Sequence, residues 1–362
     1  MTASVSIEVR GERATYPVLV GAGLLARADE WLPAGAAHEP PLVVTCPPVW
    51  RALAKPARGF AGGRPAVLIP DGERAKTLAT VAKLYEAFVR RRLDRSATIL
   101  ALGGGVVGDV AGFAAATYLR GLRLIQVPTT LLAQVDSAIG GKVGVNLAAG
   151  KNLVGAFHAP SLVVCDPTVL ASLPRREFRA GLYEVIKYGV IASRLLFDRI
   201  AAGLDGLVAH DMQALPEVIA ACCRIKAAIV SDDEREAGPR RVLNFGHTVG
   251  HALEALTAYR RFRHGEAVAY GMLAAARLSV DRGVLDAEDA SALQRLVARL
   301  GPLPPVTDLK TPDALALIGH DKKVVGGRLH VVLARGLGAT TIVDDVSSAE
   351  LTAAMRAIGM KA

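Results

Sequence analysis

The segment ATILALGGGVVGD (97–109) decides the fold of the first half of the chain. Its apolar run, 97–102, has the length and β-branched content of a buried strand. The turn that follows places Gly103, Gly105 and Gly108 in the spacing G-x-G-x-x-G before Asp109, where a helix is expected to open. Glycines in a strand–turn–helix context let backbone amides approach a pyrophosphate, whose charge the helix N-terminus stabilises. The segment therefore predicts a dinucleotide site in an α/β domain.

Strand-like and helix-like stretches alternate around this segment. Further strands are expected at 41–46, 65–70, 122–127 and 161–166, an added hairpin over 5–21, and helices at 76–91 and 110–119. This alternation predicts a mainly parallel sheet flanked by helices.

After about residue 175 the apolar period becomes helical. Helices are expected at 177–192, 194–209, 215–231, 247–258, 264–283, 287–300 and 348–358, with a late hairpin within 327–343. We therefore expect two domains, an α/β domain over 1–175 and a helical domain over 176–362.

Composition narrows the class of protein. With 362 residues, 51% apolar and 21% charged, the chain is expected to be folded and globular. It has no apolar run of membrane-spanning length, and its start, MTASVSIEVRGE, has no apolar signal-peptide core. The four cysteines form no C-x-x-C pair, which favours buried thiols in a cytoplasmic protein. The net charge of +9 comes from scattered arginines, which favours an anionic small substrate over nucleic acid.

Two further segments bear on the dinucleotide. The acid expected about 20 residues after the glycine turn is absent, since neither Asp nor Glu occurs between Asp109 and Asp136. DGERAK (71–76) could offer Asp71 and Glu73 instead, although taken alone it better fits an exposed turn that leads into a helix. The glycine-rich stretch 127–160 predicts a loop on which Lys142 and Lys151 converge to bind phosphate groups.

A carboxylate and two imidazoles suggest a metal. Glu184 lies in the apolar helix AGLYEVIKYG, three residues before Lys187, and a buried carboxylate needs a cation or a metal. His247 and His264 begin two helices, and with Glu184 they suit a catalytic Zn²⁺ with one open position. His251 lies on the same helical face as His247, so a two-histidine motif or a purely structural role stays open.

Many ordered motifs resemble the 3-dehydroquinate synthase family over essentially the whole chain. The matching segments are DGERAKT, GGGVVGDVAGFAAATYLRG, QVPTTLLAQVDSAIGGKVGVN, GKNLVGAFHAP, EVIKYG, LNFGHTVGHALE, HGEAVAYGM and DKKVVGGRL. The resemblance implies a Rossmann-like α/β N-terminal domain, an all-α metal-binding C-terminal domain and a homodimer. It also implies a cyclase that eliminates phosphate from 3-deoxy-D-arabino-heptulosonate 7-phosphate, with catalytic NAD and one divalent ion, Zn²⁺ or Co²⁺.

The resemblance also assigns site residues. Metal ligands fall on Glu184, His247 and His264. NAD contacts fall on Asp71, Gly72, Glu73, Arg74, Ala75, Lys76, Gly105, Val106, Val107, Gly108, Asp109, Thr129, Thr130, Lys142, Lys151, Val169, Leu170, Ala171 and Ser172. Substrate contacts fall on Asp136, Lys142, Asn152, Lys187, Lys226, Arg240, Asn244, His251 and Lys322, with Arg120 reaching the substrate phosphate from the partner subunit.

Three alternatives stay open at this stage. One is a related cyclase acting on sedoheptulose 7-phosphate or glucose 6-phosphate, neither of which carries the carboxylate that Arg240 and Asn244 favour. A metal-dependent polyol dehydrogenase, which consumes NAD stoichiometrically, is the second, and a non-catalytic nucleotide-binding protein is the third. Tyr183 and Pro239 depart from the family pattern, and Tyr183 adds bulk beside the expected ligand Glu184.

Overall fold

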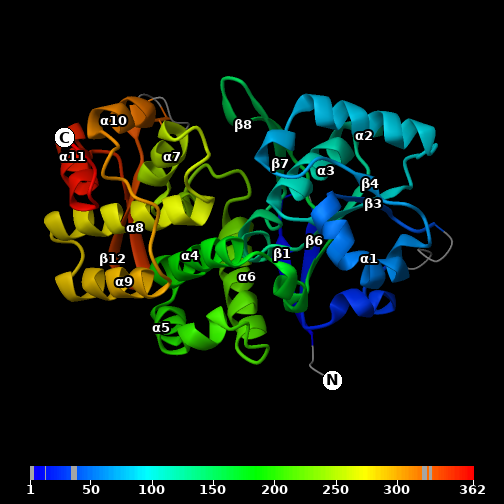
Figure 1. The fold of residues 1–362 in the computed structure, drawn as a ribbon, viewed down its shortest axis with the longest axis horizontal. Helices are drawn as coiled ribbons and strands as arrows, with labels where there is room; N and C mark the ends of the chain where they lie inside the picture. The colour runs from blue at the N-terminus through cyan, green and yellow to red at the C-terminus, as the bar shows by residue number, and fades with distance from the viewer. Residues whose placement is uncertain (1–3, 13, 34–38, 320–323, 326–327) are drawn as a thin grey trace. The chain divides into compact units, whose positions relative to one another are not determined.

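The computed structural model describes residues 4–12, 14–33, 39–319, 324–325 and 328–362 (Figure 1). The chain divides into two compact units, Met1–Pro174 with His210–Arg235 (unit 1) and Arg175–Ala209 with Glu236–Ala362 (unit 2). The expected second domain included helix 215–231, whereas α6 (Leu215–Asp232) packs on β1 (Val5–Arg10) in unit 1. Apolar residues of α6, among them Val218 and Ile219, are buried, which explains why it stays with the sheet.

Unit 1 contains a seven-stranded sheet in the order β1-β2-β9-β6-β5-β3-β4. The other strands are β2 (Thr15–Val20), β3 (Leu42–Thr45), β4 (Val67–Leu68), β5 (Thr98–Gly103), β6 (Arg123–Pro128) and β9 (Leu162–Cys165). β1 and β2 form the predicted antiparallel hairpin, and all other neighbouring strands are parallel. The predicted strands and the parallel sheet are confirmed.

The strand order creates a natural binding edge. Apart from the hairpin strand β2, the parallel strands are β3, β4, β5, β6 and β9. Numbered 1 to 5 in chain order, they lie side by side in the order 2-1-3-4-5, so the winding reverses between β3 and β5. Ligands of open α/β sheets bind beyond the carboxyl ends of the strands at such a reversal. The glycine turn of Gly103–Gly108 follows β5 and therefore lies at this position.

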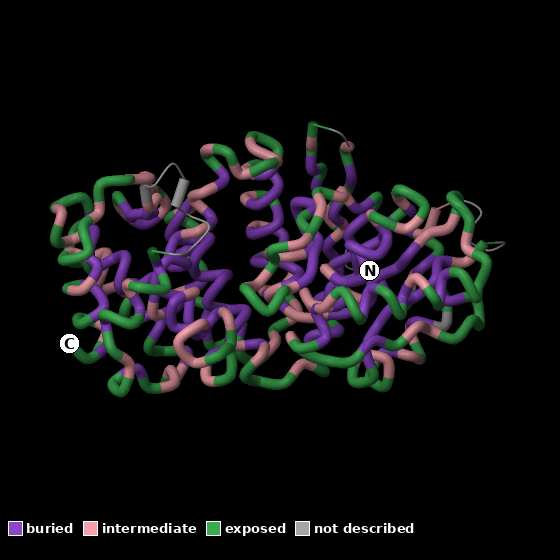
Figure 2. Tube along the Cα trace, turned by 90° about the horizontal axis from the view of Figure 1, so that it is seen from above, coloured by how far each residue is buried: buried purple, intermediate pink, exposed green. Residues whose placement is uncertain are grey.

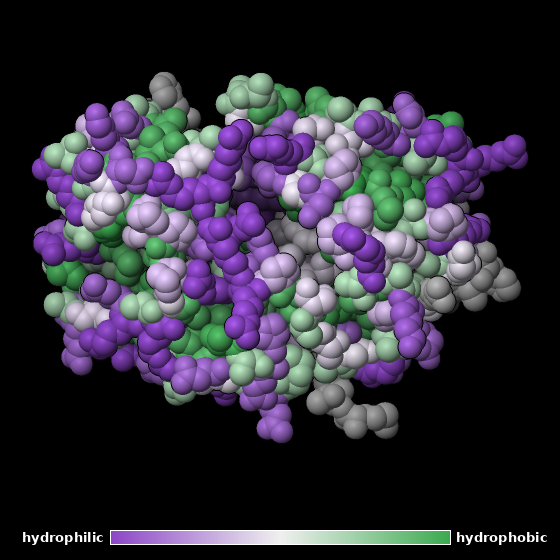
Figure 3. All heavy atoms as spheres, in the orientation of Figure 1, coloured by the Kyte–Doolittle hydropathy of each residue, from purple (hydrophilic) through white to green (hydrophobic). Residues whose placement is uncertain are grey.

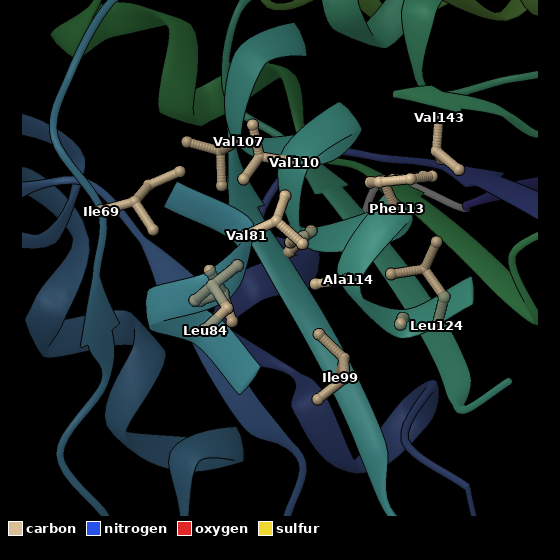
Figure 4. Packing of buried hydrophobic residues seen from close by; sticks show 14 of the residues in the cluster. Ile69, Val81, Leu84, Ile99, Val107, Val110, Phe113, Ala114, Leu124 and Val143 are labelled. Atoms are coloured by element: carbon tan, nitrogen blue, oxygen red, sulfur yellow. The ribbon is translucent and has the colours of Figure 1, made fainter. Parts of the chain in front are cut away.

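Helices α1 (Pro47–Ala61), α2 (Leu78–Arg90) and α3 (Gly105–Thr117) connect these strands and cover both faces of the sheet (Figure 1). Successive strand residues point to opposite faces. Ile99 packs with Leu84 of α2 and with α3 in one core (Figure 4), whereas Leu100 packs with Phe60 of α1 in the other. Both cores are buried, as the interior of unit 1 in Figure 2 shows.

The glycine-rich stretch after β6 is more ordered than the predicted loop. It forms the π-helical turn η5 (Ala133–Ser137) and a hairpin of β7 (Lys142–Leu147) and β8 (Gly150–Phe157). Val143 and Val145 are buried against α3, so the alternation of a strand was present but masked by glycines. A Cβ on Gly144 would lie 2.5 Å from the Val154 oxygen, so glycine there serves strand pairing.

Unit 2 is mostly helical. Its helices are α4 (Arg175–Ala192), α5 (Arg194–Val208), α7 (His247–Leu256), α8 (His264–Asp281), α9 (Ala287–Arg299), α10 (Thr311–Gly319) and α11 (Ser348–Ala357). The late hairpin is confirmed as β12 (Val331–Gly336) and β13 (Ala339–Val343), and β10 (Val324–Val325) pairs with β11 (Arg328–Leu329). The unit is therefore not strictly all-α, and α10 was not predicted.

Glycine permits a close approach between α7 and α8 in unit 2. A Cβ on Gly271 of α8 would lie 1.7 Å from the backbone oxygen of Gly246, the residue that precedes α7. Only glycine at 271 lets α7 and α8 approach this closely, and both helices begin with a histidine of the predicted metal set.

Hydrophilic side chains cover much of the surface seen in Figure 3, with hydrophobic ones scattered among them. Among the described residues, none of the helices has both the length and the apolar character that a membrane span requires.

Candidate active site

Glu184, His247 and His264 converge within unit 2. Their potential ligand atoms all lie within 4.8 Å of one another. His247 Nε2 lies 3.7 Å and His264 Nε2 lies 3.5 Å from Glu184 Oε1. Three helices supply the groups: Glu184 comes from the middle of α4, and the histidines are the first residues of α7 and α8. The structure thus brings together the three residues that the sequence singled out.

The Nδ1 atom of each histidine lies within hydrogen-bond distance of an oxygen. His247 Nδ1 lies 3.1 Å from the carbonyl oxygen of Phe245, and His264 Nδ1 lies 3.1 Å from Glu254 Oε2. An imidazole that donates from Nδ1 presents the lone pair of Nε2 to the opposite side. In both residues that side faces Glu184, and such outer hydrogen bonds orient histidine ligands in metal sites.

The electrostatics of this cluster favour positive charge at His264. Burial alone lowers the pKa of His264, but Glu254 and Glu184 outweigh burial and raise it to about 10. Lys187 is 1% exposed and forms an ion pair with Glu184, which is completely buried. Two carboxylates therefore surround His264. One carboxylate and two oriented imidazoles form a donor set that fits a divalent ion such as Zn²⁺ with an open position.

Other predicted residues lie near this cluster in unit 2. The His251 ring is 5.3 Å from that of His247 and 6.0 Å from that of His264, centroid to centroid. Arg240 and Asn244 belong to the 3₁₀ segment η7 (Pro239–Asn244), where Arg240 is 2% exposed and Asn244 Nδ2 donates to Glu236 Oε1 at 2.6 Å. Lys322 lies outside the described residues.

The glycine turn of unit 1 is tightly packed. The helix α3 begins at Gly105, earlier than expected, so Gly105 and Gly108 lie within its first turn. A Cβ on Gly104 would lie 2.9 Å from Thr130 Cγ2, and one on Gly108 would lie 2.8 Å from Gln126 Oε1. These glycines let β6 and its following turn approach the helix N-terminus, which is an anion-binding position.

The segment DGERAK adjoins this turn. Lys76 forms an ion pair with Asp109 of α3, and burial raises the pKa of Asp109 even though Lys76 lowers it. Burial, together with the neighbouring Asp71 carboxylate, raises the pKa of the Cys46 thiol at the end of β3 to about 11. Asp71 and Lys76 therefore flank the reversal between β3 and β5.

The remaining predicted cofactor segments follow β6 and β9. Thr129 donates its backbone N–H to the carbonyl oxygen of Gly103 at 3.0 Å, and Thr130 Oγ1 accepts from the Ala133 N–H at 3.1 Å. Val169 to Ser172 lie in the 3₁₀ segment η6 (Pro167–Ser172), directly after β9. Carboxyl ends of parallel strands meet at one edge of a sheet, so these segments share the edge that carries the glycine turn.

The prediction that Lys142 and Lys151 converge on one loop is wrong. Lys142 begins β7 and pairs with Phe157, whereas Lys151 lies beside the turn at the other end of the hairpin. Lys151 Nζ lies 3.7 Å from Glu73 Oε1, and Glu73 also accepts from Asn146 Nδ2 at 2.7 Å. Lys151 therefore adjoins DGERAK, and Asn152, whose N–H donates to Asn146 Oδ1 at 2.9 Å, lies next to it.

Two predicted substrate residues of unit 1 contact each other. Asp136 of η5 and Lys226 of α6 form an ion pair that is largely buried.

Arg120 is exposed in the short η4 segment (Tyr118–Arg120), where Leu119 and Arg120 both have positive φ, 49° and 71°.

The sequence matches known proteins over most of its length. The model of the 3-dehydroquinate synthase N-terminal region matches residues 66–180, and that of the C-terminal region matches residues 181–324. The 3-dehydroquinate synthase of Solibacter usitatus is 44% identical over 94% of this chain and 96% of its own length. That of Nostoc punctiforme is 51% identical over 77% of this chain and 78% of its own. The chain belongs to the 3-dehydroquinate synthase family of carbon–oxygen lyases.

Solved structures agree with this family. ValA, the 2-epi-5-epi-valiolone synthase of Streptomyces hygroscopicus subsp. jinggangensis 5008 with NAD⁺ and Zn²⁺ bound, is 30% identical with a TM-score of 0.86, covering 95% of this chain and 97% of its own. A 2-deoxy-scyllo-inosose synthase complexed with carbaglucose-6-phosphate, NAD⁺ and Co²⁺ is 27% identical with a TM-score of 0.87, covering 98% of this chain and all of its own. The expected fold is confirmed.

The geometry adds residues that the sequence reasoning missed. Glu254 lies three residues after His251 and seven after His247, so helical spacing alone placed it on the same face of α7. Gln134 is completely buried and its Nε2 donates to the carbonyl oxygens of Pro128 and Asp166, at the ends of β6 and β9. No spacing rule points to Gln134, because its partners lie on separate strands.

Proposed function

We propose that this chain converts 3-deoxy-D-arabino-heptulosonate 7-phosphate into 3-dehydroquinate and phosphate, the shikimate-pathway step of aromatic amino acid biosynthesis. The observation that carries the proposal is the convergence of Glu184, His247 and His264 in a chain of this family. When bound, NAD⁺ would supply reversible hydride transfer at C5 of the substrate, and a divalent ion would supply polarisation of the C4 and C5 oxygens.

In unit 2, Glu184 Oε1 and the Nε2 atoms of His247 and His264 hold the divalent ion, Zn²⁺ or Co²⁺. Phe245 and Glu254 support this assignment, because their oxygens fix the outer side of each imidazole. His251 accepts the proton of the substrate hydroxyl and passes it to solvent, a role that suits a half-buried imidazole beside the cluster.

In unit 1, the edge at the reversal between β3 and β5 binds NAD. The N-terminus of α3 takes the pyrophosphate through Gly105–Asp109. Asp71 to Lys76, Thr129, Thr130, Lys151 and Val169 to Ser172 line the same edge. Lys76 supports the assignment, because its ion pair with Asp109 joins two of these segments.

The substrate is an anion at both ends. Asn152 binds the phosphate group, with Arg120 from the partner subunit, and the phosphate dianion itself removes the C6 proton. Lys142 contacts the substrate from the other end of the hairpin. Lys226 and Arg240 bind the carboxylate, for which a buried guanidinium offers two parallel donors. The remaining substrate contacts come from Asp136, Lys187, Asn244 and Lys322.

A homodimer in the cytoplasm is part of the proposal. Leu119, Leu147, Leu153 and Phe157 expose between 39% and 45% of their surface on η4 and the β7–β8 hairpin. Apolar side chains of this size, next to the exposed Arg120, favour burial against a second copy of the chain. The four buried, unbridged cysteines favour a reducing compartment.

A sibling cyclase acting on sedoheptulose 7-phosphate is the second candidate, because the similar solved structures include a 2-epi-5-epi-valiolone synthase and a 2-deoxy-scyllo-inosose synthase. Identities of 43% and 44% to 3-dehydroquinate synthases over nearly the whole chain, against 30% and 27% to those two, favour the heptulosonate. Glycerol dehydrogenases at 16% identity share the fold alone.

The test is phosphate release with trace NAD, measured on both substrates for the native chain and for Arg240→Ala. Loss of a hydrogen bond to a charged group costs about 1.5–3 kcal/mol. At about 1.4 kcal/mol per tenfold, Arg240→Ala lowers kcat/KM for the heptulosonate about ten- to a hundredfold.

The matched control is Arg241→Ala, the neighbouring arginine of η7, which leaves this value near that of the native chain. Native preference for sedoheptulose 7-phosphate, or full efficiency of Arg240→Ala on the heptulosonate, refutes the proposed substrate.

A further inference from the structure

The backbone carbonyl of Gln134 occupies an unusual position in the turn η5. In an α-helix it accepts from the N–H of Ala138, and in a regular π-helix from that of Ile139. Here the Ala138 N–H donates to Ala133 at 3.2 Å, and the Ile139 N–H donates to Asp136 at 3.1 Å. Both backbone donors that helical geometry assigns to the Gln134 carbonyl are therefore used elsewhere.

Two buried thiols take their place. Cys223 Sγ of α6 lies 3.3 Å and Cys165 Sγ of β9 lies 3.6 Å from the Gln134 carbonyl oxygen. Both cysteines are completely buried, and a carbonyl oxygen has two lone pairs for two donors. The neighbouring Cys223 thiol and burial raise the pKa of Cys165 well above its ordinary value, so Cys165 keeps its proton at neutral pH.

The same turn carries Asp136. Asp136 follows Gln134 by two residues, and its ion-pair partner Lys226 follows Cys223 by three residues on α6. Residues three apart on a helix share a face, so Cys223 and Lys226 contact two residues of the same turn, Gln134 and Asp136. A change in the path of η5 at Gln134 therefore displaces the Asp136 carboxylate from Lys226.

We propose that Cys165 and Cys223 are positioning residues: by donating to the Gln134 carbonyl, their thiols hold the turn in which Asp136 meets Lys226. This rests on the proposed function in one respect, namely that Asp136 and Lys226 contact the substrate. The thiols contact neither substrate nor cofactor in this assignment, and they act through the turn.

The test compares Cys165→Ala/Cys223→Ala with Cys165→Ser/Cys223→Ser. Alanine and serine leave similar space, but only serine keeps a proton donor for the carbonyl. With two weak donors lost, the alanine variant raises the KM for the heptulosonate about tenfold, with a smaller change in kcat, and the serine variant restores most of it. Cys222→Ala is the matched control, since adjacent helical residues point about 100° apart.

Hydrogen–deuterium exchange of the peptide spanning 133–139 provides a second measurement that needs no turnover. Exchange at Ala138 and Ile139 rises in the alanine variant and stays near native values in the serine and Cys222→Ala variants. Equal behaviour of the alanine and serine variants, or an equal effect of Cys222→Ala, overturns the positioning role.

The exchange result is separate from the proposed function, which fails instead if the native chain releases no phosphate from the heptulosonate. If the double alanine variant does not fold, Cys223→Ala against Cys223→Ser gives the same comparison with one donor.

Discussion

Replacement of Glu254 should weaken metal binding although Glu254 is not a proposed ligand. Its carboxylate is 4% exposed and lies 3.1 Å from His264 Nδ1. Loss of such an outer partner typically lowers metal affinity about 10- to 100-fold, or about 1.4–2.7 kcal/mol. Glu254→Gln keeps an acceptor for Nδ1–H and loses only the charge, so we expect the lower end of this range. Glu254→Ala also frees the ring, so we expect the upper end.

The assay is competition of the metal-stripped protein with a chromophoric chelator for Zn²⁺, which needs no turnover. Glu266→Gln is the matched control, because Glu266 is an equally buried carboxylate on α8 that bonds Arg176 at 2.7 Å and 2.8 Å instead of a histidine. We expect Glu266→Gln to lower the melting temperature and to leave the Zn²⁺ dissociation constant near the native value. An unchanged constant in Glu254→Ala, or an equal loss in Glu266→Gln, refutes the reasoning.

Three further outcomes are expected. Chelation should abolish phosphate release, and Zn²⁺ or Co²⁺ should restore it. Glu184→Gln should need far more metal, because a neutral amide is a poorer ligand. Full metal occupancy in that variant, measured by metal analysis, contradicts the ligand assignment. NAD should support many turnovers at concentrations far below the substrate without net NADH absorbance at 340 nm (roughly the reduced nicotinamide band); stoichiometric NADH indicates a polyol dehydrogenase. Gly271→Ala should lower the free energy of unfolding by about 2 kcal/mol or more in urea titrations, because its Cβ would lie 1.7 Å from the Gly246 oxygen; an unchanged midpoint shows that α7 and α8 can separate without cost.

The fold was largely predictable in segments whose apolar residues repeat with a single period, that of a strand or that of a helix. The strands of the sheet read as short apolar runs, and the helices of unit 2 read as long amphipathic ones. The prediction failed for β7 and β8, because Gly144 and Gly155 leave only Val143 and Val145 to reveal the alternation. It also failed to assign α6 to unit 1, since an apolar helical face does not identify the surface on which it packs.

The metal set could be predicted because its chemistry is specific. A carboxylate in an apolar helix costs free energy unless a cation or a metal compensates its charge. The structure brings this carboxylate together with the histidines that begin two helices. Lys142 and Lys151 show the opposite case, because a lysine near glycines carries no directional information. Their separation at opposite ends of the hairpin depends on strand register, which only the folded chain reveals.

Glu254 and the thiol pair mark the limit of sequence reasoning. Glu254 shares one helix with His247 and His251, so the period of α7 was enough to place it beside the cluster. Cys165 and Cys223 come from a strand and a helix 58 residues apart, and they meet at a backbone atom, which has no signature in the sequence. Supporting groups that lie one helical turn from a ligand can therefore be sought by spacing. Supporting groups that act through a backbone carbonyl of a third segment must be sought in the hydrogen bonds of the folded protein. In this chain the Gln134 carbonyl, which Cys165 and Cys223 contact, is such a case.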